Sequence, residues 1–256
     1  MTDPATTARP PLGLVMRSLL RADTTVVLRS RVSAFLSIVL PVVIVVATSF
    51  GKAQSRLGGA SLVIALALTI GLITSCVLGY SLTLAHDREA GVLQRLRVTP
   101  APTWTIMASR LLVQVAVNLI AAIIVVIVGA ILHGLTLSVG QYALALAVAV
   151  LGAAVFLAIG QALVALVPST TAINAIGRIL FIVLVLLGIL GATGILGDTM
   201  KSIGAWSPVG ALMTLFSDVL NGAGWSDQDA YALLACLGCV IIFTFIGVRW
   251  FRWETR

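Results

Sequence analysis

Five long apolar stretches without a charged residue constrain the fold of this 256-residue chain more than any other feature. They cover residues 32–51, 57–85, 111–177, 179–197 and 230–248. A helix needs about 20 apolar residues to cross the hydrocarbon core of a membrane. The third stretch is too long for one crossing, and it breaks at Leu132-His133-Gly134 and again at Gly140-Gln141, which predicts a turn between two spans. The sequence therefore predicts an all-α integral membrane protein with six transmembrane helices.

Basic residues fall mainly on one side of these predicted spans. If the N-terminus is inside, 13 of the 16 Lys and Arg residues lie in inner segments, and Lys52, Arg56 and Lys201 lie outside. Lys and Arg near span ends stay in the cytoplasm, so both termini are predicted to be cytoplasmic. The net charge of +7 then reflects insertion and contact with anionic lipid, and it argues against a nucleic-acid partner.

The chain before the first span divides into two parts. Residues 1–11 are rich in Thr, Ala and Pro and are expected to be disordered. Residues 12–31 place apolar side chains on one helical face and Arg17 and Arg21 on the other, which predicts an amphipathic helix on the inner leaflet. The alternative is a leader that only orients the first span. Asp23 interrupts the apolar face, so a break in the helix is expected there. The transmembrane domain follows over residues 32–253.

Residues 86–102, between the second and third spans, form the densest polar segment. A helix from Arg88 to Val98 would gather Val92, Leu93 and Leu96 on one face, and prolines would end it. Glu89, near its start, could accept hydrogen bonds from free backbone donors. Such a helix at the inner surface could lie on lipid or dock into a groove on a soluble partner.

Residues 198–229, before the last span, are too apolar for a free loop and too short to cross the membrane. They predict an external re-entrant hairpin of two short helices. Glycines at every third position precede it, at Gly188, Gly191 and Gly194. They would either serve as a gate hinge or allow close helix packing.

No catalytic or metal-binding pattern is present in the sequence. A phosphate-binding G-x-x-x-x-G-K-[ST] motif is missing, and His86 and His133 are predicted on opposite sides of the membrane. Uncharged polar residues inside the spans could join the helices by hydrogen bonds or contact a substrate. The candidate pathway residues are Phe35, Ser75, Tyr80, Gln114, Asn118 and Phe181.

The order of these parts resembles the membrane subunit of type-2 ATP-binding-cassette (ABC) exporters. The most specific match is Arg88-Glu89-x-Gly91-x-Leu93-x-Arg95-Leu96-Arg97-x-Thr99-Pro100. It is similar to the family's run of an acidic residue, Gly-Thr, Leu, basic-Leu and Thr-Pro, with Val92 where the family usually has Thr. Trp206-Ser207-Pro208 and the apolar helix after it resemble the family's re-entrant hairpin, without the proline that often opens it.

The resemblance implies a permease subunit without its own ATPase activity or cofactor. Two ABC ATPase subunits would hold ATP and Mg, a second permease subunit, identical or homologous, would complete the complex, and spans one, two and five would line the interface. The cargo would be a drug-like or lipid-like amphiphile exported across a prokaryotic plasma (inner) membrane. The alternatives are a polysaccharide or glycolipid exporter, and a membrane scaffold or sensor subunit. The residues implied in ATPase coupling are Arg88, Glu89, Gly91, Leu93, Arg95, Leu96, Thr99 and Pro100.

Overall fold

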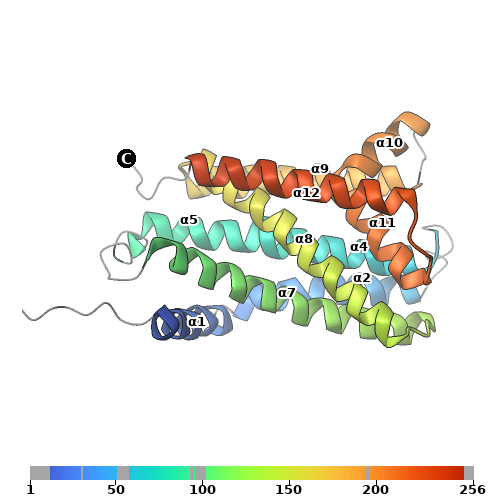
Figure 1. Cartoon of the computed structure of the whole chain (residues 1–256), viewed down its shortest axis with the longest axis horizontal. Helices are drawn as coiled ribbons and strands as arrows, with labels where there is room; N and C mark the ends of the chain where they lie inside the picture. The colour runs from blue at the N-terminus through green and yellow to red at the C-terminus, as the bar shows by residue number, and fades with distance from the viewer. Residues whose placement is uncertain are drawn as a thin grey trace, which may run out of the picture.

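A computed structural model describes residues 12–29, 31–50, 58–92, 95, 102–193 and 197–250. These residues form long helices joined by short turns, and they contain no strand (Figure 1). The elements are α1 (Leu12–Arg29), α2 (Arg31–Ser49), α4 (Ala60–Ile73), the π-helix η1 (Thr74–Tyr80), α5 (Ser81–Glu89), α7 (Thr103–His133), α8 (Val139–Leu166), α9 (Thr170–Thr193), α10 (Asp198–Trp206), α11 (Pro208–Asn221) and α12 (Asp227–Trp250). The prediction of an all-α membrane protein is confirmed at this level.

The predicted inner and outer segments gather at opposite ends of the bundle (Figure 1). One end, called the inner end here, holds α1, the end of α5, the turn between α8 and α9, and the end of α12. The other, the outer end, holds the α7–α8 turn, α10 and the α11–α12 turn. This alternation is what the predicted topology requires. The assignment of the inner end to the cytoplasm stays a prediction from the distribution of basic residues.

Five helical segments of the described chain are long and apolar enough to cross a membrane. They are residues 60–89 (α4, η1 and α5 together), 104–133, 139–166, 170–192 and 227–250. Helix α2 runs beside α4 and α7, and its apolar part, Ile38–Ser49, is shorter. Helices α10 and α11 form an apolar pair bent by 87°. The sixth crossing, which the sequence assigns to α2, stays a prediction.

The helix formed by α4 and η1 is the centre of the protomer. In an apolar 18-residue part of residues 60–89, 72% of the residues are buried, against 17% in the corresponding parts of α9 and of α12. Glycines on neighbouring helices allow this close contact: a Cβ at Gly160 of α8 would lie 2.7 Å from the carbonyl oxygen of Cys76 in η1. Helices α9 and α12 therefore form the periphery, where their apolar faces are available to lipid or to another subunit.

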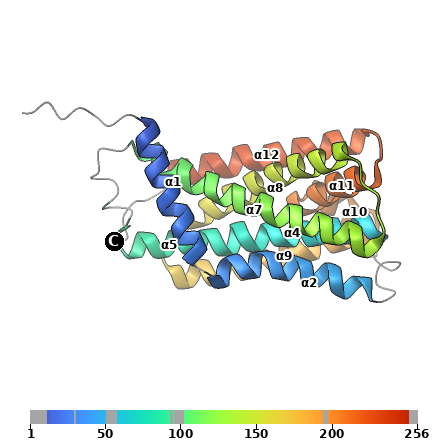
Figure 2. The same ribbon diagram turned by 90° about the horizontal axis from the view of Figure 1, so that it is seen from below.

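Helix α1 crosses the bundle helices at the inner end instead of running beside them (Figure 2). This orientation fits the predicted interfacial helix. The predicted break at Asp23 is wrong, because α1 continues through this residue to Arg29. Asp23 is accommodated because its carboxylate accepts a hydrogen bond from Ser109 of α7 and faces Arg110. A polar contact between helices therefore accounts for the residue that interrupts the apolar pattern.

The segment before α12 forms two short helices, as the sequence predicts. Ser207 separates them: its hydroxyl accepts a hydrogen bond from the Gly210 amide and caps α11, whose first residue is Pro208. Three glycines bring the backbones of α9, α10 and α11 together, since a Cβ at Gly191 would lie 2.6 Å from Gly204 Cα and one at Gly210 would lie 2.0 Å from Gly204 O. The depth of this hairpin in the membrane stays a prediction.

Candidate functional site

The inner end of the bundle is held together by Arg88, in the last turn of α5. This residue is only 3% exposed. Nη1 donates to the carbonyl of Val164 at 2.6 Å, and Nη2 donates to those of Val167 and Pro168 at 2.8 Å each. The last carbonyls of a helix have no partner within the helix, so Arg88 satisfies the C-terminal end of α8 and the turn that follows it.

Glu89, the next residue, performs the matching task for α9. Its Oε1 accepts a hydrogen bond from the amide of Thr170, the first residue of α9, at 2.8 Å. A carboxylate is favourable there because the first amides of a helix are free and carry partial positive charge. Arg88 and Glu89 thus hold both sides of the α8–α9 turn, and we call this pair the α8–α9 clamp.

The prediction that a new helix begins at Arg88 is wrong. Helix α5 includes Arg88 and Glu89, and the chain turns at Ala90 and Gly91. Gly91 has a φ of +69°, which favours glycine because other side chains are strained in this region. The Arg95 amide then donates to the Gly91 carbonyl at 3.2 Å. Leu93, Leu96, Thr99 and Pro100 lie outside the described residues. The ATPase-coupling role of the whole set stays a prediction.

Three interhelical hydrogen bonds surround η1 in the middle of the bundle. Gln114 Nε2 donates to Ser75 Oγ at 2.6 Å, and Asn118 Nδ2 donates to Cys76 Sγ at 3.1 Å. Gln161 Nε2 donates to Tyr80 Oη at 3.2 Å. These are the interhelical bonds that one of the two sequence-based alternatives predicts. No sequence pattern indicated the π-helix that places all three acceptors.

A cavity of about 310 Å³ lies between α1, η1, α5 and α7 near the inner end. Three predicted pathway residues, Ser75, Tyr80 and Gln114, line it. Asn118 does not line it, Phe181 packs on the core from α9, and the side chain of Phe35 lies outside the described part. The pathway role of all six stays a prediction.

Charged residues that sequence reasoning did not assign to a site lie at one end of this cavity. Arg110 Nη1 is 2.6 Å from Asp87 Oδ2, and its Nε is 4.0 Å from Asp23 Oδ1. Asp23 comes from α1, Asp87 from α5 and Arg110 from α7. The position of Asp23 on the apolar face of α1 was the signal that could have found this cluster.

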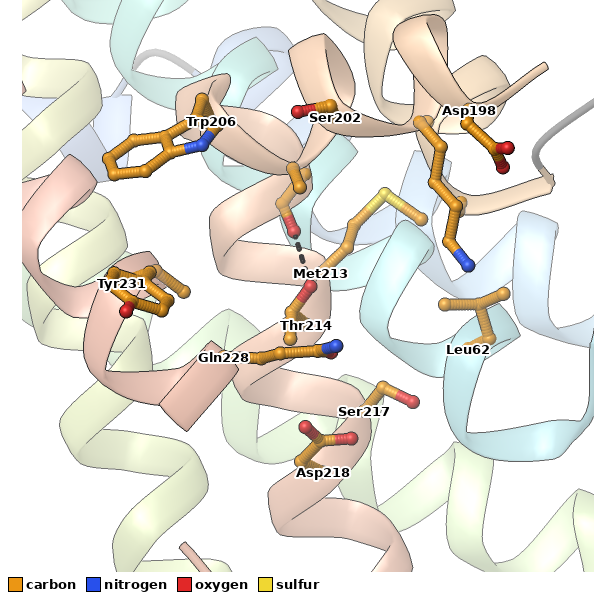
Figure 3. Close-up of a pocket in the computed structure, with 16 residues that line it drawn as sticks. Leu62, Asp198, Ser202, Trp206, Met213, Thr214, Ser217, Asp218, Gln228 and Tyr231 are labelled. Carbon is orange, nitrogen blue, oxygen red and sulfur yellow. Dashed lines mark hydrogen bonds between the residues drawn. The ribbon is translucent and has the colours of Figure 1, made fainter. Parts of the chain in front are cut away.

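A second cavity, of about 500 Å³, lies at the outer end between α9, α10, α11 and α12 (Figure 3). Trp206 and Tyr231 stand on one side of it and Asp198 on the other (Figure 3). Gly191, a predicted hinge residue, lines this cavity. Gly188 is also closely packed, since a Cβ there would lie 2.4 Å from Val209 Cγ1. The close contacts at Gly188 and Gly191 are what the close-packing alternative predicts. Gly194 lies outside the described residues. The hinge role of the three glycines stays a prediction.

A sequence profile of the family described as ABC-2 type transporter matches residues 15–221, from the first turn of α1 to the end of α11. The chain belongs to the ABC-2 type transporter family. No curated protein is similar enough to be counted as a relative. An ABC-2 membrane domain is the transmembrane permease component of an ABC transporter, and it implies an ABC ATPase as partner. Its five described helices that are long and apolar enough to cross a membrane make this ABC-2 permease a multi-pass membrane protein.

Proposed function

We propose that this ABC-2 permease is the membrane subunit of an ATP-driven exporter. It moves an amphiphilic drug-like or lipid-like molecule from the cytoplasm or inner leaflet to the outside by alternating access. Two copies of an ABC ATPase supply the energy, and a second permease subunit completes the pathway. We place the complex in the plasma membrane of a prokaryote.

The α8–α9 clamp is the observation that best supports this proposal. Residues 86–102 are the predicted contact with the ATPase, and the clamp joins the first part of this segment to the ends of two membrane helices. Helix α9 continues from the clamp to the outer end, where Gly191 packs against Gly204 of α10. A displacement at the ATPase contact would thus reach both the α8–α9 turn and the outer cavity.

The exposed surface of α9 supports a pathway shared by two subunits. Its outward side carries Ile176, Ile179, Ile182, Val183 and Leu186, which are all exposed in the protomer. The two cavities described above lie at opposite ends of the protomer, so we expect a wide pathway to need a second copy or a homologue across a two-fold axis.

Co-purification with the ATPase tests the docking step. Leu93→Asp combined with Leu96→Asp places two charges on the predicted apolar face, and we expect it to abolish co-purification while membrane insertion is kept. Val139→Asp is the control, because Val139 is 87% exposed at the outer end. Unchanged co-purification of the double variant would reject the docking role and favour a lipid-facing segment.

Cargo-dependent ATP hydrolysis separates an exporter from a scaffold or sensor subunit. In proteoliposomes of the full complex, we expect a lipophilic cargo to raise the ATPase rate and to accumulate on the side opposite the ATPase. A complex whose ATPase rate responds to no cargo and that transports none would favour the scaffold or sensor class. Transport of an oligosaccharide-linked lipid in preference to simple amphiphiles would favour the glycolipid alternative.

A further inference from the structure

Among the described residues that line the cavity at the inner end, carboxylates outnumber cations. Asp23 and Asp87 contribute two carboxylates, and Arg110 contributes the one guanidinium in this described lining. Arg110 bonds closely to Asp87, so its attraction to Asp23 acts over a longer distance of 4.0 Å. The second polar partner of Asp23 is the uncharged hydroxyl of Ser109. Among the described side chains, the two carboxylates of this cluster therefore share a single cation, and Asp23 is the more distant of the two from it.

The cavity has a charged end and a long apolar body. The charged residues lie near the ends of α5 and α7, whereas Ser75 and Val117 line the cavity deeper in the bundle. Asp87 and Ser75 are twelve residues apart, roughly 18 Å along a helix axis. Between them the walls are mainly apolar, from Val26, Leu84 and Val113. Its volume is within the range of small-molecule sites, which are mostly apolar with a few polar groups that fix orientation.

We propose that this cavity is the inner binding site for a cationic amphiphile, with the cationic group against Asp23 and the apolar body along η1 and α7. This inference rests on the proposed export function and names the class of its substrate. A positive group would provide the missing counter-charge in a partly buried place, where an ion pair is stronger than in water. An anionic amphiphile would meet the net negative charge and lose affinity.

The environment of Asp23 agrees with this assignment. Burial raises the pKa of the Asp23 carboxyl above its usual value, and the nearby Asp87 acts in the same direction, against the opposing effects of Ser109 and Arg110. Keeping this partly buried carboxyl group ionised therefore costs free energy, and a bound cation would offset that cost. The position on α1 would also place the site beside the inner leaflet, where an amphiphile accumulates.

Two lipophilic ions of matched size and opposite charge test the proposal. The purified full-length permease in nanodiscs, with and without its ATPase, would be titrated with radiolabelled tetraphenylphosphonium and with tetraphenylborate. We expect binding of the cation and much weaker binding of the anion. Asp23→Asn should weaken binding of the cation on the order of tenfold. Asp227→Asn, which removes the same charge from an exposed place at the outer end, should leave it unchanged.

Protection from labelling provides a second measurement with all three charged residues intact. Thr83, an exposed residue of α5 that lines the cavity, would be replaced by cysteine, and Ser202 in the outer cavity would be the control. Tetraphenylphosphonium should slow maleimide labelling at Thr83→Cys and not at Ser202→Cys. Any one of three results would overturn the site: equal binding of the two ions, full affinity in Asp23→Asn, or no protection of Thr83→Cys. The third result would overturn it even if its cause is a phospholipid that already fills the cavity.

The two proposals fail in different ways. If the complex hydrolyses ATP and exports a cargo but tetraphenylphosphonium binding does not depend on Asp23, the export function stands and the cationic site is rejected. If the chain recruits no ATPase yet binds the cation through Asp23, the site stands and the export function is rejected.

Discussion

Among the described residues at the inner end, Arg88 stands out by its three hydrogen bonds to another helix and its turn. One guanidinium satisfies three carbonyls of another helix and its turn, and the side chain is almost completely buried. Burying an arginine is costly unless its donors are used, and here Nη1 and Nη2 bond to three carbonyls while the buried Nε has no hydrogen-bond partner among the described residues. Arg88 therefore holds α5 against the α8–α9 turn, and any role in ATPase coupling would come in addition to this structural role.

Arg88→Leu should destabilise the permease, because it leaves three carbonyls without these donors. We expect a loss of about 2–4 kcal/mol in the free energy of unfolding, seen as a lower melting temperature in detergent. Arg95→Leu is the matched control: Arg95 is exposed, so this change should leave the melting temperature unchanged and weaken ATPase co-purification. Equal melting temperatures for the two variants would contradict the importance of the clamp for stability.

Asp23 should make stability depend on pH. Its folded-state pKa lies above the usual value of about 3.8, so the folded protein binds a proton more tightly than the unfolded one. The stabilisation from this group is complete below the usual pKa and is lost as the pH rises through the raised folded-state pKa. Asp87 and Arg110 face it from α5 and α7, and Ser109 donates to it.

Comparing the melting temperature of Asp23→Asn with that of the wild type from pH 4 to pH 8 measures this dependence. The difference should shift in favour of the variant as the pH rises, because only the wild type loses this stabilisation. Asp227→Asn should follow the wild type. A difference that moves in the opposite direction would mean that pairing with Arg110 outweighs burial at Asp23.

Among the elements, α9 and the hairpin of α10 and α11 depend most on backbone contact. Gly191 and Gly204 leave no space for a side chain between α9 and α10. Such contact between small residues is a common way to join helices in a membrane, where apolar side chains gain little from leaving lipid. Gly191 also lines the outer cavity, so a change in the contact between α9 and α10 would change the shape of that cavity as well.

Gly191→Leu should separate α9 from α10 and lower stability by about 1–3 kcal/mol, as overpacked cores do. Gly238→Leu is the control, since a Cβ at Gly238 of α12 meets no atom within 4 Å and that change should be tolerated. Thermal unfolding and transport should be measured together. A Gly191→Leu variant with normal stability but impaired transport would support the hinge alternative instead of close packing.

At the scale of the whole molecule, the two ends of the bundle separate the predicted sides of the membrane. The α8–α9 turn and the end of α5 lie at the inner end, and the α11–α12 turn lies at the outer end (Figure 1). The cation-binding cavity and the outer cavity are consequently at opposite ends of one protomer. An exporter requires such a pair of positions, one for uptake and one for release.

Single cysteines test the orientation in a background in which Cys76, Cys236 and Cys239 are replaced by alanine. An impermeant maleimide should label Gln228→Cys only from outside and Ser169→Cys only from the cytoplasmic side, because both residues are exposed at opposite ends. Labelling of Gln228→Cys from the cytoplasmic side alone would invert the topology. It would also place the cationic cavity at the wrong face for export.

The sequence by itself determined the helical class, the approximate ends of the long helices and the bent hairpin. Membrane helices must satisfy their own backbone hydrogen bonds, so apolar length and turn residues are enough to identify them. The family followed from the resemblance of the motif from Arg88 to Pro100 and from the order of the elements. The bent hairpin was predictable because its segment is too apolar for a free loop and too short for a span, and because Trp206-Ser207-Pro208 interrupts it, where Ser207 caps α11.

Only the tertiary structure decided which polar groups meet. Arg88 and Val164 are 76 residues apart in the chain, and Asp23 and Ser109 are 86 residues apart. The extra width of η1, which positions Ser75, Cys76 and Tyr80 for three neighbouring side chains, also has no local signature. Hydrogen bonds and ion pairs depend on atomic distance, and the distance between remote segments is fixed by how whole helices pack. The clamp and the charged cavity are consequences of that packing.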